Sequence, residues 1–319
     1  MKLKTMTKEE LIEGIKALKA QQNAVILAHY YTLGEIQDIA DFVGDSLALA
    51  QQAARSDADM IVMCGVHFMG ETCKILCPDK KVLVPDLAAG CSLADSCPAA
   101  DFGEFVKAHP GYTVLSYVNT TAAVKYYTDI VVTSGNALKI VNSLPKDEKI
   151  IFAPDRNLGS YINAVTGREM LLWDGACHVH EQFSTEAILK LKAEHPAAQV
   201  LVHPECKRPV VLLADKVGST AVLLRHAVES DCQEFIIATE SGILHEMMKQ
   251  APTKTFIPVP PEVSEGSVGC SCNECAYMRL NTLEKLYRCL RDGQPEILVD
   301  EQIRERAKLP IDRMLELSK

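Results

Sequence analysis

The feature that most constrains this chain is an internal repeat that occurs three times. Each copy has a run of apolar, β-forming residues that ends in a polar triplet, and a hydroxyl residue follows seventeen positions after the first member of the triplet. The first members are His29, Tyr117 and His203, which are 88 and 86 residues apart. The matching hydroxyl residues are Ser46, Ser134 and Thr220. Because this period is far longer than that of a solenoid repeat, we expect each copy to be a small domain in its own right.

The three copies continue to match after the hydroxyl residue. An amphipathic stretch, a strand-like run, a second helical stretch and a further strand-like run follow in the same order each time. Strands that alternate with helices are typical of parallel sheets. We therefore predict an α/β fold of three homologous three-layer α/β/α domains, arranged about a pseudo-threefold axis with a central active site. The predicted boundaries give a first repeat with an N-terminal helix (1–108), a second repeat (109–195), a third repeat (196–290) and a C-terminal helical tail (291–319).

Charge and hydropathy exclude two classes of partner. The net charge of −9 and a pI near 5.5 argue against nucleic acid, which selects a basic surface. The longest apolar runs are of strand length, so no membrane span is expected. The N-terminal stretch lacks the apolar core of a signal peptide and predicts an amphipathic helix capped by Thr7, with Glu10 as its capping-box partner. We expect a cytoplasmic protein.

Cysteine usage indicates a metal site. The chain has twelve cysteines, and in a reducing compartment such residues are more often metal ligands or catalytic than disulfide-bonded. Cysteines recur in the Gly-containing loop that ends each copy, at Cys91, at Cys177 and at one of Cys270, Cys272 and Cys275. The other seven are expected to pack as small hydrophobic residues. Three thiolates from three loops fit a 4Fe-4S cluster with one open iron, while zinc or no metal stays open at this point.

The polar triplets indicate proton-transfer chemistry. Parallel sheets bind ligands at the carboxyl ends of their strands, so the three triplets are expected to face one cavity. Two histidines, His29 and His203, would share it with Tyr31, Asn119 and Glu205. These groups suit proton abstraction next to a carbonyl and dehydration, with Glu205 as the natural base. Two further histidines beside Cys177, His178 and His180, have no match in the other copies and are interpreted as secondary or surface residues.

The three hydroxyl residues allow two interpretations. A Ser or Thr at the start of an apolar helical run is commonly a plain N-cap. A helix N-terminus also offers free N–H groups and partial positive charge, which suit a carboxylate or a phosphate. Recurrence at one offset favours anion binding by Ser46, Ser134 and Thr220.

At this point the chain resembles the quinolinate synthase family of de novo NAD biosynthesis. The matching stretches cover most of the chain in order: AHYY (28–31), GDS (44–46), AGCSLAD (89–95), YVN (117–119), TSGN (133–136), PDRNLG (154–159), WDGACHVH (173–180), HPEC (203–206), GST (218–220) and CAYMRLNTLEK (275–285).

The resemblance implies three homologous α/β/α domains and a defined reaction. The family condenses iminoaspartate with dihydroxyacetone phosphate, releases phosphate and two waters, and forms quinolinate. Its 4Fe-4S cluster has three cysteine ligands, which correspond to Cys91, Cys177 and Cys275; Cys275 is chosen because the family's xxMxxN stretch follows it. Its substrate-binding positions correspond to His29, Ser46, Tyr117, Asn119, Ser134, His203, Glu205 and Thr220. The catalytic positions correspond to Tyr31, Glu205, His29 and His203.

Other consequences of the resemblance concern partners and extra cysteines. Because iminoaspartate is unstable, an L-aspartate oxidase or dehydrogenase is expected as its source. Relatives often space their extra cysteines CxxCxxC, whereas this chain has CxCxxC, so the spacing does not favour a regulatory disulfide between Cys270 and Cys272; zinc there stays open. Two other functions remain as alternatives: an aconitase-like hydro-lyase acting on a di- or tricarboxylate, and a non-enzymatic iron-sulfur sensor.

Overall fold

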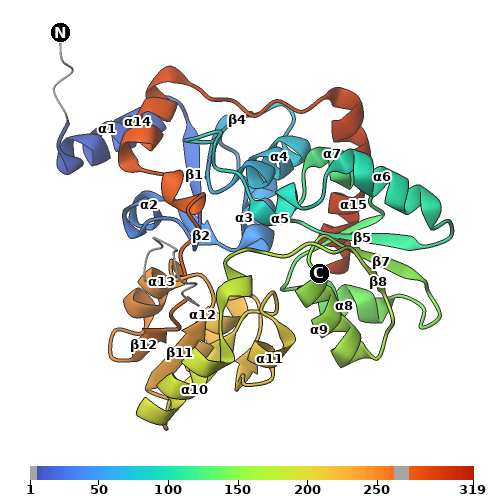
Figure 1. Cartoon of the computed structure of the whole chain (residues 1–319). Helices are drawn as coiled ribbons and strands as arrows, with labels where there is room; N and C mark the ends of the chain where they lie inside the picture. Colours follow the sequence, from blue (N-terminus) through green and yellow to red (C-terminus); the bar gives the residue numbers. More distant parts are fainter. Residues whose placement is uncertain (1–5, 262–272) are drawn as a thin grey trace, which may run out of the picture. The chain divides into compact units, whose positions relative to one another are not determined.

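A computed structural model of the chain describes residues 6–261 and 273–319. Its strands form three separate parallel sheets (Figure 1). The strands of the first are β1 (Ala24–His29), β2 (Phe42–Gly44), β3 (Met60–Cys64) and β4 (Lys81–Leu83). Those of the second are β5 (Thr113–Tyr117), β6 (Ile130–Val132), β7 (Ile150–Ala153) and β8 (Leu171–Leu172). Those of the third are β9 (Gln199–Val202), β10 (Lys216–Val217), β11 (Glu234–Ala238) and β12 (Thr255–Pro258).

All three sheets have the same strand order. It runs β2-β1-β3-β4 in the first, β6-β5-β7-β8 in the second and β10-β9-β11-β12 in the third. The inner strands are apolar because helices cover the faces of such sheets; all five residues of β3 are buried. The predicted α/β fold with three copies of one unit is therefore confirmed, while the exact domain boundaries stay a prediction.

A hydrogen bond from a strand N–H to an aspartate side chain recurs in every copy and was not anticipated from the sequence. In each sheet the aspartate directly before the second strand accepts a hydrogen bond from a backbone N–H of the first strand. The three pairs are Asp41 with Ile26 at 2.8 Å, Asp129 with Val114 at 2.9 Å and Asp215 with Val200 at 2.7 Å. Each pair is fifteen residues apart, so the copies match down to single hydrogen bonds.

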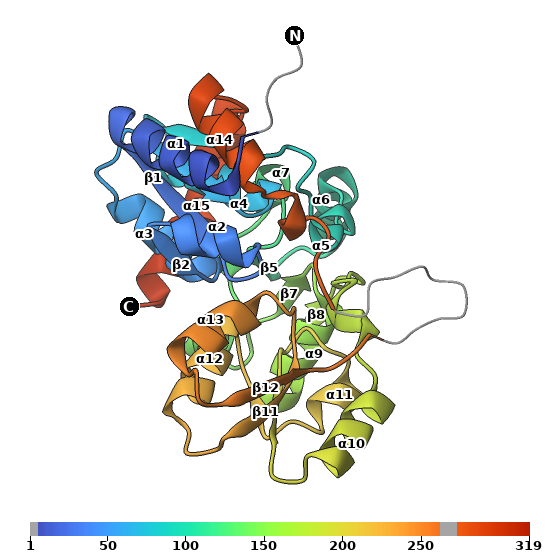
Figure 2. The same ribbon diagram turned by 90° about the vertical axis from the view of Figure 1, so that its left-hand side faces the viewer.

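The chain divides into two compact units, and the first holds the first sheet. This unit comprises residues 1–91 and 276–301. Its helices are α1 (Lys8–Gln21), α2 (Gly34–Ile39), α3 (Ser46–Arg55), α4 (His67–Leu76), the 3-10 helix η2 (Met278–Leu280) and α14 (Leu283–Asp292). The predicted N-terminal helix is α1, and Thr7 and Glu10 form its capping box. Figure 2 shows α1 beside α14, and both helices contribute to one buried apolar cluster.

The second unit holds the second and third sheets. It comprises residues 92–275 and 302–319. Its helices are α5 (Ser92–Asp95), α6 (Ala99–Ala108), α7 (Ala122–Lys125), α8 (Ala137–Ser143), α9 (Arg156–Thr166), η1 (His180–Gln182), α10 (Thr185–Glu194), α11 (Arg208–Val211), α12 (Thr220–Glu229), α13 (Ile243–Gln250) and nearly all of α15 (Glu301–Leu317). None of the helices in the described part of the chain is long and apolar enough to cross a membrane.

Candidate active site

Two of the three polar triplets lie in the second unit, at the carboxyl ends of strands. Tyr117 is the last residue of β5, and His203 is the first residue after β9. The side chains of Tyr117, His203 and Glu205 are all buried. Parallel sheets bind their ligands at this edge, so the triplets occupy the position expected of them.

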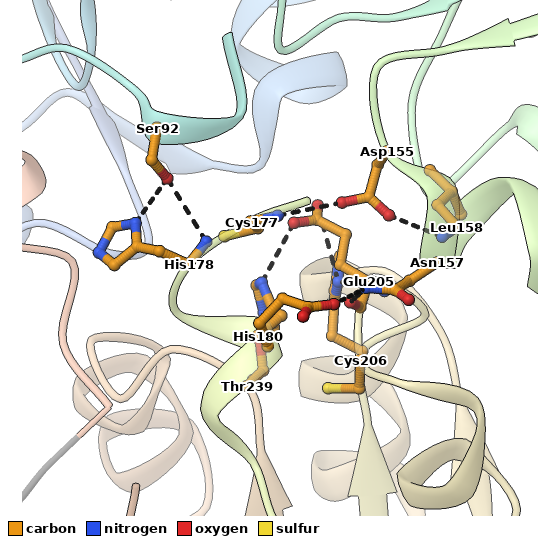
Figure 3. A network of polar contacts seen from close by, with 12 residues as sticks. Ser92, Asp155, Asn157, Leu158, Cys177, His178, His180, Glu205, Cys206 and Thr239 are labelled. Atoms are coloured by element: carbon orange, nitrogen blue, oxygen red, sulfur yellow. Dashed lines mark hydrogen bonds and ion pairs between the residues drawn. The ribbon is translucent and has the colours of Figure 1, made fainter. Parts of the chain in front are cut away.

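The carboxylate of Glu205 is the centre of a buried polar network. Tyr117 donates its hydroxyl to Glu205 Oε1 at 2.5 Å. His203 Nδ1 lies 3.8 Å from the same oxygen, and His180 Nδ1 lies 3.1 Å from Oε2 (Figure 3). His180 Nδ1 makes no hydrogen bond with a described residue, so this contact is electrostatic. The network joins the second sheet to the third and brings together three of the predicted site residues.

The network controls the charge of Glu205. Burial alone would raise the pKa of its carboxyl group, but the positive charges of His180 and His203 and the hydrogen bond from Tyr117 hold that pKa at about 2. Burial and then the negative charge of Glu205 raise the pKa of Asp155 well above its usual value. Glu205 is therefore ionised at neutral pH.

His180 is a site residue that the sequence interpretation missed. We expected it to be secondary or exposed, but its side chain is only 2% exposed. Its ring stacks on that of His203 at a centroid distance of 4.6 Å, and its Nε2 lies 3.0 Å from Thr239 Oγ1. The surface interpretation is therefore wrong for His180, which lies against the predicted site residues Glu205 and His203. His178 is half-buried and contacts Ser92 Oγ at 2.5 Å.

Two buried oxygen atoms near the ends of β5 and β6 indicate where a ligand could bind. Asn119 Oδ1 and Thr133 Oγ1 have no hydrogen-bond partner among the described residues. A buried polar atom without a partner is costly unless a ligand or water satisfies it. Lys125, itself fully buried, fixes the loop around Asn119 by donating to the carbonyl oxygens of Val118 and Thr120.

Two of the predicted hydroxyl residues, Ser46 and Thr220, are the first residues of helices but do not cap them. The N-cap of α3 is Asp45, one residue before Ser46, and the N-cap of α12 is Ser219, one residue before Thr220. Ser134 lies in the turn before α8, which Asn136 closes by accepting the N–H of Thr133 at 2.6 Å. The plain N-cap interpretation is therefore wrong for Ser46 and Thr220.

The first unit carries the remaining triplet, built like that of the third copy. His29 ends β1 and is buried, and its Nδ1 accepts the backbone N–H of Tyr31 at 3.2 Å. His203 accepts the N–H of Glu205 in the same way at 3.3 Å. The rings of His29 and Tyr31 meet edge to face at 4.5 Å.

The cysteines fall into two environments. Cys91, Cys177 and Cys275 are half-buried in loops, whereas six others are buried: Cys64, Cys73, Cys77, Cys97, Cys206 and Cys289. Burial raises the pKa of the thiols of Cys97 and Cys289 to about 12. Such thiols are poor metal ligands, which must be thiolates. Cys232 is half-buried, while Cys270 and Cys272 lie outside the described residues.

The three loop cysteines occupy equivalent positions. In every copy the third residue after β3, β7 or β11 donates its backbone N–H to the carbonyl oxygen two residues before the cysteine; we call this bond the loop clamp. The pairs are His67 with Ala89 at 2.7 Å, Arg156 with Gly175 at 2.8 Å and Ser241 with Asn273 at 3.1 Å. The clamp makes Cys275 the counterpart of Cys91 and Cys177.

The donor set fits a metal group. Three equivalent, half-buried thiols offer soft ligands of one kind, as iron-sulfur clusters require. Ligand atoms of Cys177, His180 and Glu205 also lie within 4.8 Å of one another. The residues present are thus compatible with a metal group next to the carboxylate network.

Comparison with known proteins agrees with this geometry. A family model described as "Quinolinate synthetase A protein" matches residues 13–316. A quinolinate synthase of Synechococcus sp. is 56% identical over 309 residues, which cover 97% of this chain and 95% of the relative. The corresponding proteins of Microcystis aeruginosa and Thermosynechococcus vestitus are both 56% identical over 97% of this chain and 96% of the relative. The chain therefore belongs to the quinolinate synthetase A protein family and is an enzyme of NAD biosynthesis.

Proposed function

We propose that the enzyme condenses iminoaspartate with dihydroxyacetone phosphate to form quinolinate, with release of phosphate and two waters. The observation that carries this proposal is the buried, ionised Glu205 in contact with Tyr117, His180 and His203 at the strand ends. Condensation, imine formation and dehydration all require protons to be removed and returned next to a carbonyl or imine carbon.

Glu205 is the proposed proton acceptor. Its low pKa keeps the carboxylate ionised, and its burial excludes bulk water from the proton transfer. His180 and His203 contact the carboxylate and stabilise its negative charge, and Tyr117 holds the carboxylate in place. We assign further proton transfers to His29 and Tyr31, whose rings contact each other in the first unit.

The anionic groups of the substrates need polar partners rather than a basic surface. We propose that Ser46, Ser134, Thr220 and Asn119 bind carboxylate and phosphate groups. Support comes from the place of Ser46 and Thr220 at the first residue of α3 and α12, where backbone N–H groups point outward. The unpartnered oxygen atom of Asn119 is the kind of group that a substrate amine or hydroxyl satisfies.

The loop cysteines Cys91, Cys177 and Cys275 would hold a 4Fe-4S cluster. Their shared position at the loop clamp and their half-buried thiols support this assignment. When bound, such a cluster supplies a Lewis-acidic iron that has no protein ligand. We further propose that the enzyme is cytoplasmic and receives iminoaspartate from an L-aspartate oxidase or dehydrogenase.

The test is an anaerobic assay of the reconstituted enzyme with iminoaspartate generated by an added L-aspartate dehydrogenase, with NAD⁺ as the oxidant. With dihydroxyacetone phosphate present, we expect quinolinate and phosphate to appear in equal amounts. Glu205→Gln, with unchanged metal content, should lose activity by about 10²- to 10⁴-fold. Turnover of a di- or tricarboxylate without the triose phosphate would instead establish the hydro-lyase alternative, and no turnover of any of these compounds by metal-loaded protein would favour a sensor.

A further inference from the structure

Two buried carboxylates lie directly behind two of the three loop cysteines. Asp155 is the second residue after β7, and Glu240 is the second residue after β11, so they occupy the same position in the second and third copies. Their side chains are 0% and 1% exposed. Buried carboxylates are rare unless their oxygens are hydrogen-bonded, so their contacts are informative.

Each carboxylate binds the backbone of a loop cysteine. Asp155 Oδ2 accepts the N–H of Cys177 at 3.3 Å, and Glu240 Oε1 accepts the N–H of Cys275 at 3.0 Å. Figure 3 shows Asp155 between Cys177 and Leu158. These bonds bridge 22 and 35 residues of sequence, so they tie each cysteine loop to the strand end of its own sheet.

The second oxygen of each carboxylate is also used. Asp155 Oδ1 accepts the N–H of Leu158 at 2.7 Å, and Glu240 Oε2 accepts the N–H of Gly242 at 2.7 Å. Two N–H donors, one on each oxygen, need two acceptor oxygens, which a carboxyl group supplies. An amide of the same shape has only one oxygen, and its NH₂ group would face the other N–H donor.

The hydrogen bonds to the carboxylates lie next to the loop clamp and link the same two segments at a second point. In the second copy Arg156 N–H binds the carbonyl oxygen of Gly175, while Cys177 N–H binds Asp155, so the two segments are paired at two points. Gly175 approaches so closely that a Cβ there would lie 2.5 Å from the carbonyl oxygen of Pro154. The loop before Cys177 therefore has little freedom to move.

The first copy has the loop clamp but no acidic residue at the position of Asp155 and Glu240. The residue there is Val66, whose side chain cannot accept a hydrogen bond. His67 N–H still binds the carbonyl oxygen of Ala89, and Asp86 instead accepts the N–H of Ala88 at 2.8 Å and the Lys285 ammonium at 2.6 Å. A carboxylate at this position is thus present in the second and third copies and absent from the first.

We propose that Asp155 and Glu240 are positioning residues that hold the backbone of Cys177 and Cys275 in the conformation required to bind the metal group. This inference rests on the proposed cluster site. Groups that orient metal ligands typically change metal affinity by about 10- to 100-fold when they are replaced. Asp155 and Glu240 act through the cysteine backbone and need not touch the metal themselves.

The test compares Asp155→Asn and Glu240→Gln with Asp129→Asn after anaerobic reconstitution of the full chain. Asp129 is a matched control because it also accepts a backbone N–H, that of Val114, but binds no cysteine loop in the described part of the chain. We measure the rate of iron release to a chelator and the electron paramagnetic resonance spectrum of the reduced protein. A thermal melt of each variant reports whether the fold is kept.

We expect iron release to accelerate by about 10- to 100-fold in Asp155→Asn and in Glu240→Gln, with an altered spectrum, and neither change in Asp129→Asn. Because the two variants probe different copies, one that fails to fold leaves the other to decide. If folded Asp155→Asn and Glu240→Gln release iron at the wild-type rate and give the wild-type spectrum, this inference is overturned, while the cluster assignment is not affected. A wild-type protein that binds neither iron nor sulfide would overturn the cluster assignment as well.

Discussion

The hydroxyl of Tyr117 donates a 2.5 Å hydrogen bond to Glu205 Oε1, although the two residues are 88 positions apart in the sequence. Tyr117 ends β5 and Glu205 follows β9, so the bond joins equivalent strand ends of the second and third sheets. A short hydrogen bond to an ionised carboxylate is among the stronger polar contacts in a protein.

Tyr117→Phe removes this bond and keeps the ring. Because the hydroxyl lowers the pKa of Glu205, the variant should have a Glu205 of higher pKa and a less firmly held carboxylate. We expect quinolinate formation to fall by about 10- to 100-fold, the equivalent of one hydrogen bond to a charged group. The measurement is kcat at saturating substrates, with iron content as the control. An unchanged kcat would mean that the bond does not contribute to turnover.

His180→Asn tests the residue that the sequence interpretation missed. The charge of His180 is the first of the interactions that hold the pKa of Glu205 down, so its removal should raise that pKa. A carboxylate with a depressed pKa stays ionised until the pH falls to that value. In a plot of kcat/KM against pH, the fall at acidic pH that is caused by protonation of Glu205 should therefore occur at higher pH in the variant.

The matched control for this experiment is His178→Asn. His178 is two residues away and contacts Ser92. Its replacement should leave the fall at acidic pH where it is in the wild type. Equal displacement in both variants would show that the effect is not specific to the Glu205 network.

Alkaline pH should destabilise the enzyme through its buried thiols. Burial raises the pKa of Cys97 and Cys289 to about 12, whereas the ordinary value is 9.0. A group whose pKa is raised on folding contributes its full stability below the unfolded-state pKa and loses it as the pH rises through the folded-state pKa. Between pH 9 and 12 each thiol should therefore cost about 1.4 kcal/mol of unfolding free energy per pH unit.

Urea titrations across this range check the prediction on Cys289→Ala. This variant should show a shallower loss of stability with pH than the wild type. A wild-type slope in Cys289→Ala would contradict the assignment.

Asp129→Ala tests the hydrogen bond between an aspartate and a strand N–H that recurs in the three sheets. The substitution leaves the N–H of Val114 without its acceptor at the start of β5. We expect the free energy of unfolding to fall by about 1–3 kcal/mol, the usual result of orphaning a buried donor. Iron content and kcat should stay at wild-type values, because Asp129 contacts none of the proposed site residues in the described part of the chain. A loss of activity without a loss of stability would contradict this structural role.

The repeat made much of the fold predictable. A period near 87 residues fixed three equivalent sheets, and placement of the polar triplets after the first strand of each sheet followed from the alternation of strands and helices. The capping box of α1 was also visible as a local pattern. These features depend on residues close in sequence or on spacing that the copies share.

The missed features depend on contacts that no periodicity encodes. His180 has no counterpart in the other copies, so the repeat gave no reason to place it against Glu205. Asp155 and Glu240 act through single hydrogen bonds to cysteine loops 22 and 35 residues away. The caps Asp45 and Ser219 were missed because each lies one residue before the hydroxyl that the repeat singled out.

The most direct test of the central claim is an anaerobic analysis of iron and acid-labile sulfide. It compares the wild type with Cys91→Ala, Cys177→Ala and Cys275→Ala, and with Cys232→Ala as the control. We predict about four iron and four sulfide per chain in the wild type and the control, and loss of both in each of the three loop variants. Zinc without sulfide, or a cluster that survives Cys275→Ala, would contradict a cluster held by these three cysteines.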